Sequence, residues 1–220
     1  MSETSTESGW SLDLAEDIDL PGWVWLPEDM DAAQRRDWVE EVTPAVLDLV
    51  SPPGGAEEAT SEAEVRGLIE SALDSRAGSP SYAMYLVWPV RAPAAVMCHV
   101  NLTRTEDLPD WGDLEGRMHG VEARNLGPGV QITTDVTVEG ADGPEELVTV
   151  IYVFVEDEAA VVINIEPSLP QLVGPAMLGV GMFMNAIAVS RPGGKPFAAQ
   201  PTTAPLITAD EWETDAEGVS

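Results

Sequence analysis

Three consecutive β-rich runs between residues 130 and 165 place the strongest constraint on the fold of this chain. In the first run, 130–138, apolar residues alternate with polar ones, which is the period-two pattern of a strand with one face in water. The next two runs, Leu147–Val155 and Ala159–Ile165, are joined only by the acidic turn 156–158, a spacing typical of a hairpin. Because strands joined by short turns pair antiparallel, the sequence predicts an antiparallel meander.

The clearest helix is predicted from Ser61 onward. Ser61 and Glu64 have the spacing of a capping box, and an apolar stripe follows at helical spacing: Val65, Leu68, Ile69, Ala72 and Leu73. Upstream, Glu28–Asp37 begins a helix with acidic residues in its first turn, and apolar residues continue the helical spacing over 38–49. Pro44 leaves open whether this region is one helix or two helices that meet at an angle.

Three further strands and a short helix complete the predicted order. Trp23–Leu26 precedes a proline and predicts a short strand, while Tyr82–Trp88 and Ala95–Thr103 predict two longer ones. A short helix is predicted over Asp110–Met118, with His119 at its C-terminal end. There a positively charged imidazolium would interact favourably with the helix dipole and cap the helix.

This order of elements predicts an α+β fold: an antiparallel sheet of about five to six strands with helices packed on its faces. The folded domain is predicted over residues 20–197. Two acidic tails, 1–19 and 198–220, flank it, and their content of Ser, Thr, Glu and Pro predicts flexible chain.

A long segment without charge, Pro167–Ser190, raises the question of a membrane span. If it spanned, Arg191 and Lys195 would favour a cytoplasmic C-terminus, and the acidic first 166 residues would have to cross without a signal. Several Pro and Gly residues also dilute its hydrophobicity. We therefore expect no membrane span but a buried core helix over about 171–188, in a cytoplasmic protein.

The charge balance excludes one class of partner. The chain has 39 Asp and Glu residues against 10 Lys and Arg residues, for a formal net charge of −29. Such a surface repels polyanions, so we expect no nucleic acid to bind by direct electrostatic attraction. The same field attracts a basic protein partner.

Few residues offer chemistry. Cys98 is the single cysteine, so no intramolecular disulfide forms, and the two histidines, His99 and His119, have no zinc-site spacing. Cys98 and His99 are neighbours on a predicted strand, and their side chains therefore point to opposite faces and cannot act as a dyad. We expect no catalytic residue, no metal and no cofactor.

Tryptophans and one acidic turn are the candidates for contact with a partner. Exposed indole rings are typical anchors of protein interfaces, and acidic side chains suit a basic partner. For the tryptophans in the two tails, folding back onto their own domain is an equally good interpretation. The candidate residues are Trp10, Trp23, Trp25, Glu156, Asp157, Glu158 and Trp212.

The element order resembles that of one known superfamily. A strand that ends in Trp25-Leu26-Pro27, then helices, a meander over 130–165 and a closing helix over 171–188 resemble the Mog1/PsbP-like α/β/α sandwich, over residues 20–190. This resemblance implies a binding or accessory protein rather than an enzyme, since the superfamily includes bacterial lipoproteins and proteins linked to secretion or toxin immunity. It carries no diagnostic motif, so it assigns no functional residue.

Three functions follow from these observations. The first is a non-catalytic cytoplasmic protein, such as an immunity protein, secretion adaptor or inhibitor, that binds a basic protein partner. The second is a small-molecule-binding protein or hydrolase with a pocket between sheet and helices, in which Asp135, His99 or His119 is the acid–base group. The third is a homo-oligomer that assembles through the last helix, which would then leave an apolar face uncovered in the monomer.

Overall fold

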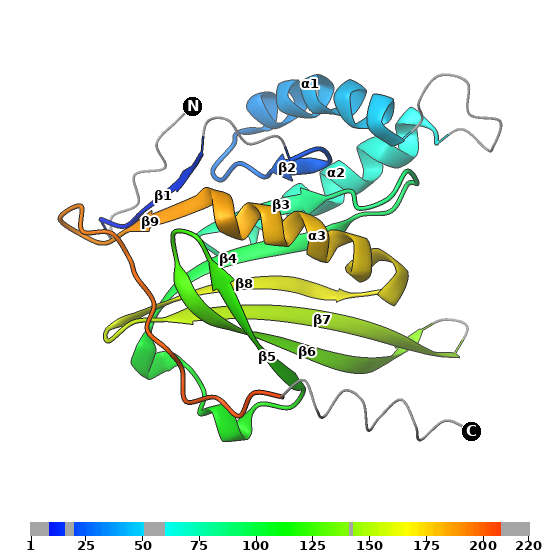
Figure 1. Ribbon diagram of the computed structural model, residues 1–220. Coiled ribbons are helices and arrows are strands. Elements are labelled where there is room, and N and C mark those ends of the chain that lie inside the picture. Colours follow the sequence, from blue (N-terminus) through cyan, green and yellow to red (C-terminus); the bar gives the residue numbers. More distant parts are fainter. Residues whose placement is uncertain (1–8, 16–19, 51–59, 141–142, 208–220) are drawn as a thin grey trace.

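The computed structural model describes residues 9–15, 20–50, 60–140 and 143–207. Its centre is a strongly twisted antiparallel sheet of seven strands in the order β2-β3-β4-β8-β7-β6-β5 (Figure 1). These strands are β2 (Trp23–Trp25), β3 (Ala83–Val87), β4 (Val96–Arg104), β5 (Arg117–Ala123), β6 (Gly127–Gly140), β7 (Gly143–Val155) and β8 (Ala159–Ser168). A second sheet pairs β1 (Ser11–Leu14) with β9 (Ile187–Ser190).

Helices pack on both faces of the large sheet. The side chains of β3 show this arrangement, because they alternate between two apolar clusters. The three α-helices are α1 (Ala32–Val50), α2 (Glu62–Ala77) and α3 (Pro170–Ala186). Tyr85 and Val87 pack with α3 in the main core, whereas Met84 and Leu86 pack with α1 and α2. All five residues of β3 are buried. The predicted α+β fold, with helices packed on the sheet, is confirmed.

The face that carries α1 and α2 is apolar at both ends and polar in the middle. Met97 on β4 packs against the α1–α2 core, and Ile151 on β7 packs in a third apolar cluster. Between them lie His99 on β4 and Asn164 on β8, which are register partners, and Asn164 in turn pairs with Ile151. Paired residues point to the same side of a sheet, so a polar strip separates the two apolar clusters.

Two local predictions are confirmed in detail. The capping box is formed: the Ser61 Oγ accepts a hydrogen bond from the Glu64 backbone N–H, and the Glu64 carboxylate accepts one from the Ser61 backbone N–H. The strands β7 and β8 form the expected antiparallel hairpin around the turn 156–158. Both features depend on residues within a few positions of one another.

The region around Pro44 is one helix, α1, and not two. The helix begins after Asp31, whose Oδ1 accepts hydrogen bonds from the backbone N–H groups of Ala33 and Gln34. Proline removes the hydrogen bond to the carbonyl of Glu40, an exposed residue that water can reach. The helix therefore continues through the proline, although the predicted start over 28–37 lies four residues too early.

The predicted helix over 110–118 is wrong. Two short 3-10 turns occupy this region, η1 (Thr105–Asp107) and η2 (Trp111–Asp113), and Arg117 already belongs to β5. His119 therefore lies within a strand, opposite Gln131 of β6, and does not cap a helix. Residues 117–123 form a strand because all seven of them pair with β6. A local pattern in the sequence does not show this pairing.

The described parts of both predicted tails contact the domain. In the N-terminal segment, β1 pairs with β9 over Ser11–Leu14. In the C-terminal segment, the backbone N–H groups of Ala199, Gln200 and Ile207 each donate a hydrogen bond to the sheet region. The large sheet has seven strands rather than the predicted five to six because β5 joins it, and β1 with β9 adds a second sheet. No helix within the described ranges has both the length and the apolar character that a membrane crossing requires.

Candidate functional site

The most exposed large apolar side chains of the described residues lie on α3. Leu178 is 78% exposed and Met182 is 51% exposed. These residues are four positions apart, so they lie on one side of the helix. The opposite side of α3 contributes Val180 and Phe183 to the main core, where both are fully buried. The predicted contribution of this helix to the core is confirmed, but its outer side is uncovered.

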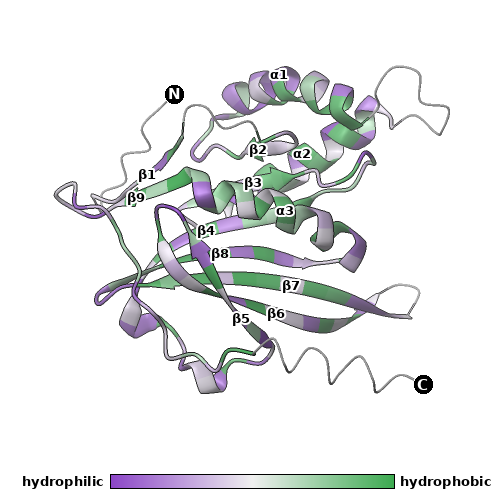
Figure 2. Cartoon of the chain, in the orientation of Figure 1, coloured by the Kyte–Doolittle hydropathy of each residue, from purple (hydrophilic) through white to green (hydrophobic). Residues whose placement is uncertain are grey.

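The outer side of α3 has no charged residue to make it compatible with water. Surface helices usually place charged and polar residues on the side opposite the core. Between Gln171 and Asn185 the exposed residues of α3 are Gly174, Pro175, Leu178 and Met182. Figure 2 shows the middle of α3 as hydrophobic, in contrast to the alternating colours along α1. We call Leu178 and Met182, with the exposed residues between Gln171 and Asn185, the α3 surface.

The edge strand β2 packs against α3 through a tryptophan. The ring of Trp23 stacks on Phe183, with centroids 4.9 Å apart and planes inclined by 22°. Trp23 approaches the helix closely because Gly179 has no side chain: a Cβ at Gly179 would lie 2.7 Å from the Trp23 Nε1. Trp25 points to the same side of the sheet two residues later and is 41% exposed. Trp25 is the more exposed of these two candidate anchors, and a role for either residue in partner binding stays a prediction.

The remaining tryptophan candidates lie elsewhere. Trp10 packs partly buried against the main core, and its carbonyl accepts a hydrogen bond from the Tyr82 hydroxyl at 3.1 Å. This is the folded-back arrangement that the sequence left open for the tails. Trp212 lies outside the described residues. A role for either residue in partner binding stays a prediction.

The acidic turn between β7 and β8 has partners within the chain. Glu156 is buried, and its Oε1 lies 3.1 Å from the Nη1 of Arg191, which also pairs with Glu158. Asp157 accepts a hydrogen bond from the side chain of Gln200 at 3.0 Å. These contacts attach the turn to the chain that follows β9. Asp157 and Glu158 remain exposed, and their contact with a basic partner stays a prediction.

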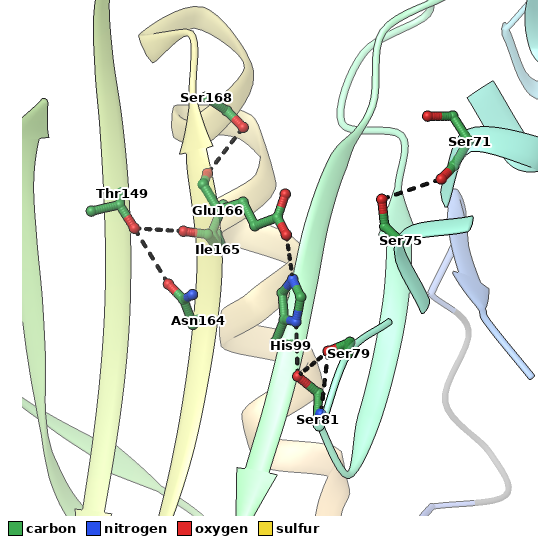
Figure 3. A network of polar contacts seen from close by, with 10 residues as sticks. All are labelled: Ser71, Ser75, Ser79, Ser81, His99, Thr149, Asn164, Ile165, Glu166 and Ser168. Atoms are coloured by element: carbon green, nitrogen blue, oxygen red, sulfur yellow. Dashed lines mark hydrogen bonds and ion pairs between the residues drawn. The ribbon is translucent and has the colours of Figure 1, made fainter. Parts of the chain in front are cut away.

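A chain of hydrogen bonds lies in the polar strip on the other face of the sheet (Figure 3). The Nδ1 of His99 is 2.9 Å from the Oγ of Ser81, and its Nε2 is 2.7 Å from the Oε1 of Glu166. His99 is 13% exposed at its side chain, and Ser81 is buried. Serine, imidazole and carboxylate are thus connected in one line across β4 and β8.

A β-bulge places Glu166 in this line. On β7 the register advances two residues, from Val148 to Val150, while on β8 it advances three, from Ile165 to Ser168. The extra residue falls at Glu166-Pro167, and proline suits a bulge because it has no N–H to donate to the ladder. The Thr149 hydroxyl donates to the Ile165 carbonyl at 2.7 Å (Figure 3). The bulge is thereby held in place, and the Glu166 side chain reaches His99.

A buried arginine fixes the serine end of the line. Arg76, at the end of α2, is 3% exposed; its Nη1 donates to the Ser81 carbonyl at 2.7 Å and its Nη2 to Glu28 at 2.8 Å. Ser81 also borders an open pocket of about 400 Å³ at the end of β4. Asn101 and Thr103, on the same side of β4 as His99, line this pocket as well.

The other candidate acid–base residues do not join His99. His119 lies on β5, at the far edge of the sheet from β4, and Asp135 is an exposed residue of β6 that pairs with Arg117 at 3.5 Å. The carboxylate that does contact His99 is Glu166, which sequence reasoning missed. No local signal could have identified it, because 67 positions separate the two residues and only the pairing of β4 with β8 brings them together.

Cys98 is a buried thiol, as the sequence predicts. It lies in the main core, while His99 points to the opposite face. Burial raises the pKa of Cys98 to about 12 and that of Tyr152 to about 12, and it also raises the pKa of Tyr85. Cys98 therefore remains protonated at neutral pH and is no nucleophile.

Within the described ranges, no group of three or more His, Cys, Asp or Glu side chains has a geometry that could hold a metal ion. Comparison of the chain with protein-family models, with curated proteins and with solved structures finds no match. The features of the described residues that suggest a function are the α3 surface and the polar strip.

Proposed function

We propose that this chain is a protein-binding accessory protein that holds a basic partner against the α3 surface. The observation that carries this proposal is the exposure of Leu178, 78%, on a helix without charged residues. Its cytoplasmic location is part of the same proposal, as is the kinship with Mog1/PsbP-like accessory proteins.

The free energy of burial favours an occupant for this surface. Burying a fully exposed Leu or Met side chain contributes about 1.5–3 kcal/mol. Leu178 and Met182 offer this gain side by side, and Trp25 adds an exposed indole on the same side of the sheet. Apolar and aromatic anchors of this kind carry most of the binding energy in protein interfaces, while the surrounding rim mainly excludes water.

The charge of the chain favours a basic partner over a second copy. A net charge of −29 makes two copies repel each other at a distance, whereas a basic protein is attracted and its association is accelerated. The α3 surface then supplies the short-range contact, without a buried charge that would have to be desolvated. Electrostatic attraction of this kind weakens as salt screens it.

The test is affinity capture from the native cell extract with wild-type protein and with two variants that each add one carboxylate. Leu178→Asp places the charge in the proposed interface, and we expect partner recovery to fall at least about tenfold, a loss of roughly 1.4 kcal/mol or more. Ala63→Asp places it on an exposed position of α2 and should leave recovery unchanged. Both proteins should melt within a few degrees of wild type.

Two outcomes would contradict the proposal. Recovery of the same partner by Leu178→Asp at the wild-type level would remove the α3 surface from the interaction. Sedimentation of the purified protein as a dimer that Leu178→Asp dissociates would instead favour self-assembly through α3. Recovery of a basic partner that declines with added salt would support the proposed electrostatic attraction.

A further inference from the structure

A second site lies on the face of the sheet opposite α3 and is independent of the proposed protein interface. We propose that Ser81 is a nucleophile activated by His99 as general base, and that this site hydrolyses small, neutral or cationic carboxylic esters. Glu166 is the positioning residue that orients His99. The proposal rests on geometry, on the surroundings of the serine and on the pocket that it borders.

The geometry meets the two distance requirements of nucleophilic catalysis. A nucleophile must lie within hydrogen-bond reach of its base, and the base must be oriented by a third group. The Ser81 Oγ and the His99 Nδ1 are 2.9 Å apart, and the His99 Nε2 and the Glu166 Oε1 are 2.7 Å apart (Figure 3). Ser81 lies just before β3, His99 in the middle of β4 and Glu166 in the bulge of β8.

The partners of His99 select the tautomer that catalysis needs. An ionised carboxylate only accepts hydrogen bonds, so the Nε2 facing Glu166 carries the proton. The Nδ1 is then the free lone pair, and it accepts the Ser81 hydroxyl proton. When His99 takes up that proton, the Glu166 carboxylate stabilises the resulting imidazolium.

The Ser81 oxygen is prepared for attack by a neighbouring serine. The Ser79 hydroxyl donates to the Ser81 Oγ at 2.9 Å, while the Ser81 backbone N–H donates to the Ser79 Oγ at 3.2 Å. A hydroxyl has two acceptor lone pairs, so one remains for a substrate carbon. Because Ser79 is the donor, the Ser81 hydroxyl hydrogen is left to point at the His99 Nδ1.

The surrounding structure holds these groups without rearrangement. Arg76 binds the Ser81 carbonyl and is buried, which fixes the backbone at the nucleophile. At the other end, the Thr149 and Ser168 hydroxyls donate to the Ile165 and Glu166 carbonyls within the bulge. A site held by packed and hydrogen-bonded neighbours is preorganised, which lowers the cost of reaching the transition state.

The pocket beside Ser81 defines the class of substrate. Its volume of about 400 Å³ accommodates a small molecule. Asn101 lines it on the same side of β4 as His99, and its side-chain amide can donate a hydrogen bond to the oxygen that becomes negative. Three carboxylates line the pocket against one cation, Arg104, so a neutral or cationic ester is favoured over an anion; the carboxylates are those of Glu28, Asp107 and Glu158.

The reaction balances with water as the only co-reactant. The Ser81 Oγ attacks the ester carbonyl carbon, and its proton moves to the His99 Nδ1. The bond to the leaving alcohol breaks as the same nitrogen protonates the alcohol oxygen, which leaves an acyl group on Ser81. Water then attacks this acyl group, His99 takes a proton from the water, and the proton returns to Ser81 as the carboxylic acid leaves.

The experiment treats the full-length protein with a fluorophosphonate probe, which phosphonylates activated serines, and locates the modified residue by mass spectrometry. We expect modification at Ser81 in the wild type and none at this position in Ser81→Ala. Ser75→Ala is the matched control, because Ser75 is an exposed serine of α2 whose hydroxyl donates to the Ser71 carbonyl; modification of Ser81 in this variant should equal that of the wild type. Absence of modification at Ser81 in folded wild-type protein would overturn the proposal.

Substitutions of the base and of its positioning residue test the mechanism separately. His99→Asn should slow phosphonylation of Ser81 at least about 100-fold, because the general base is lost. Glu166→Gln keeps the shape of the side chain, which is half exposed, and removes its charge. For p-nitrophenyl acetate hydrolysis we expect Glu166→Gln to lower kcat about tenfold or more with KM unchanged. Wild-type rates in both variants would show that Ser81 is not activated by His99.

Discussion

The helices on the two faces of the sheet differ in how they meet solvent. On one face, α2 has a capping box at its start and exposed acidic residues along its length, with an ion pair between Glu62 and Arg66 at 3.0 Å. On the other face, α3 starts without a side-chain cap, has no charged residue and exposes Leu178 and Met182. The outer side of α2 suits water, whereas the outer side of α3 suits another apolar surface.

The two sides of α3 have different roles: the inner side stabilises the fold, and the outer side is the proposed binding surface. The inner side of α3 is as well packed as that of α2, since Phe183 and Val180 are fully buried. On the outer side, Leu178 and Met182 are mostly exposed, so we expect these side chains to add little to the stability of the fold. Substitutions on the two sides of α3 should therefore affect different measurements.

The largest effect is expected from the inner side of α3. Phe183→Ala removes a buried ring that stacks on Trp23 and meets Tyr85 edge-on, so we expect a loss of about 3–5 kcal/mol in the free energy of unfolding. Leu178→Ala, five positions earlier on the exposed side, should change it by less than about 0.5 kcal/mol. Urea unfolding of both variants measures the difference. Equal destabilisation would mean that the outer side of α3 is part of the fold.

Alanine substitutions at two glycines of α3 should change the stability of the protein in opposite directions. A Cβ at Gly179 meets the Trp23 ring, so Gly179→Ala should destabilise the protein by about 1–3 kcal/mol. A Cβ at Gly181 meets no atom within 4 Å, so Gly181→Ala should stabilise it by about 0.5–1 kcal/mol through lost backbone freedom in the unfolded chain. Thermal melting distinguishes them. A stabilising Gly179→Ala would contradict the close packing of β2 on the helix.

A smaller effect than that of Phe183→Ala or Gly179→Ala is expected at the cap of α2. Ser61→Ala removes one half of the capping box and should cost about 0.5–2 kcal/mol near pH 7. The hydrogen bonds from the Ser61 hydroxyl and backbone N–H hold the pKa of Glu64 below its ordinary value of 4.5. A carboxylate with a lowered pKa in the folded state stabilises the fold above its unfolded pKa, and this contribution is lost as the pH falls through the folded pKa.

The difference in stability between wild type and Ser61→Ala should therefore shrink when unfolding is measured near pH 3 rather than near pH 7. The control is Ser71→Ala on the same helix, which lies outside the capping box and should show no such pH dependence. A difference that stays the same between pH 7 and pH 3 would mean that the Glu64 carboxylate does not take part in the cap.

Elements with short-range signals were predicted well. The capping box needs only Ser61 and Glu64 within one turn, and the β7–β8 hairpin needs two β-rich runs and a three-residue turn. In contrast, β5 was missed, and the predicted helix over 110–118 ran into its first two residues. The pattern of β5 does not alternate, and its strand conformation comes from pairing with β6. The strands β1 and β9 were missed for a similar reason: each consists of four residues that are stabilised by the other.

The candidate sites divide in the same way. The sequence named His99 and the apolar last helix, but it could not assign a carboxylate to His99 or say which side of the helix is covered. Hydrophobicity along the whole of α3 shows that the helix must be buried somewhere, without identifying the side. Only the position of the sheet decides that Phe183 is inside and Leu178 is outside.

By itself, the sequence determined the α+β class, the meander, the start of α2 and the charge that repels polyanions, because these depend on neighbouring residues or on simple sums. The tertiary structure alone decided the contact between His99 and Glu166 and the exposure of Leu178. The first requires residues 67 positions apart to meet through the pairing of β4 with β8, and the second requires a sheet for the helix to lie on. Such relations arise from packing, which no local pattern of residues encodes.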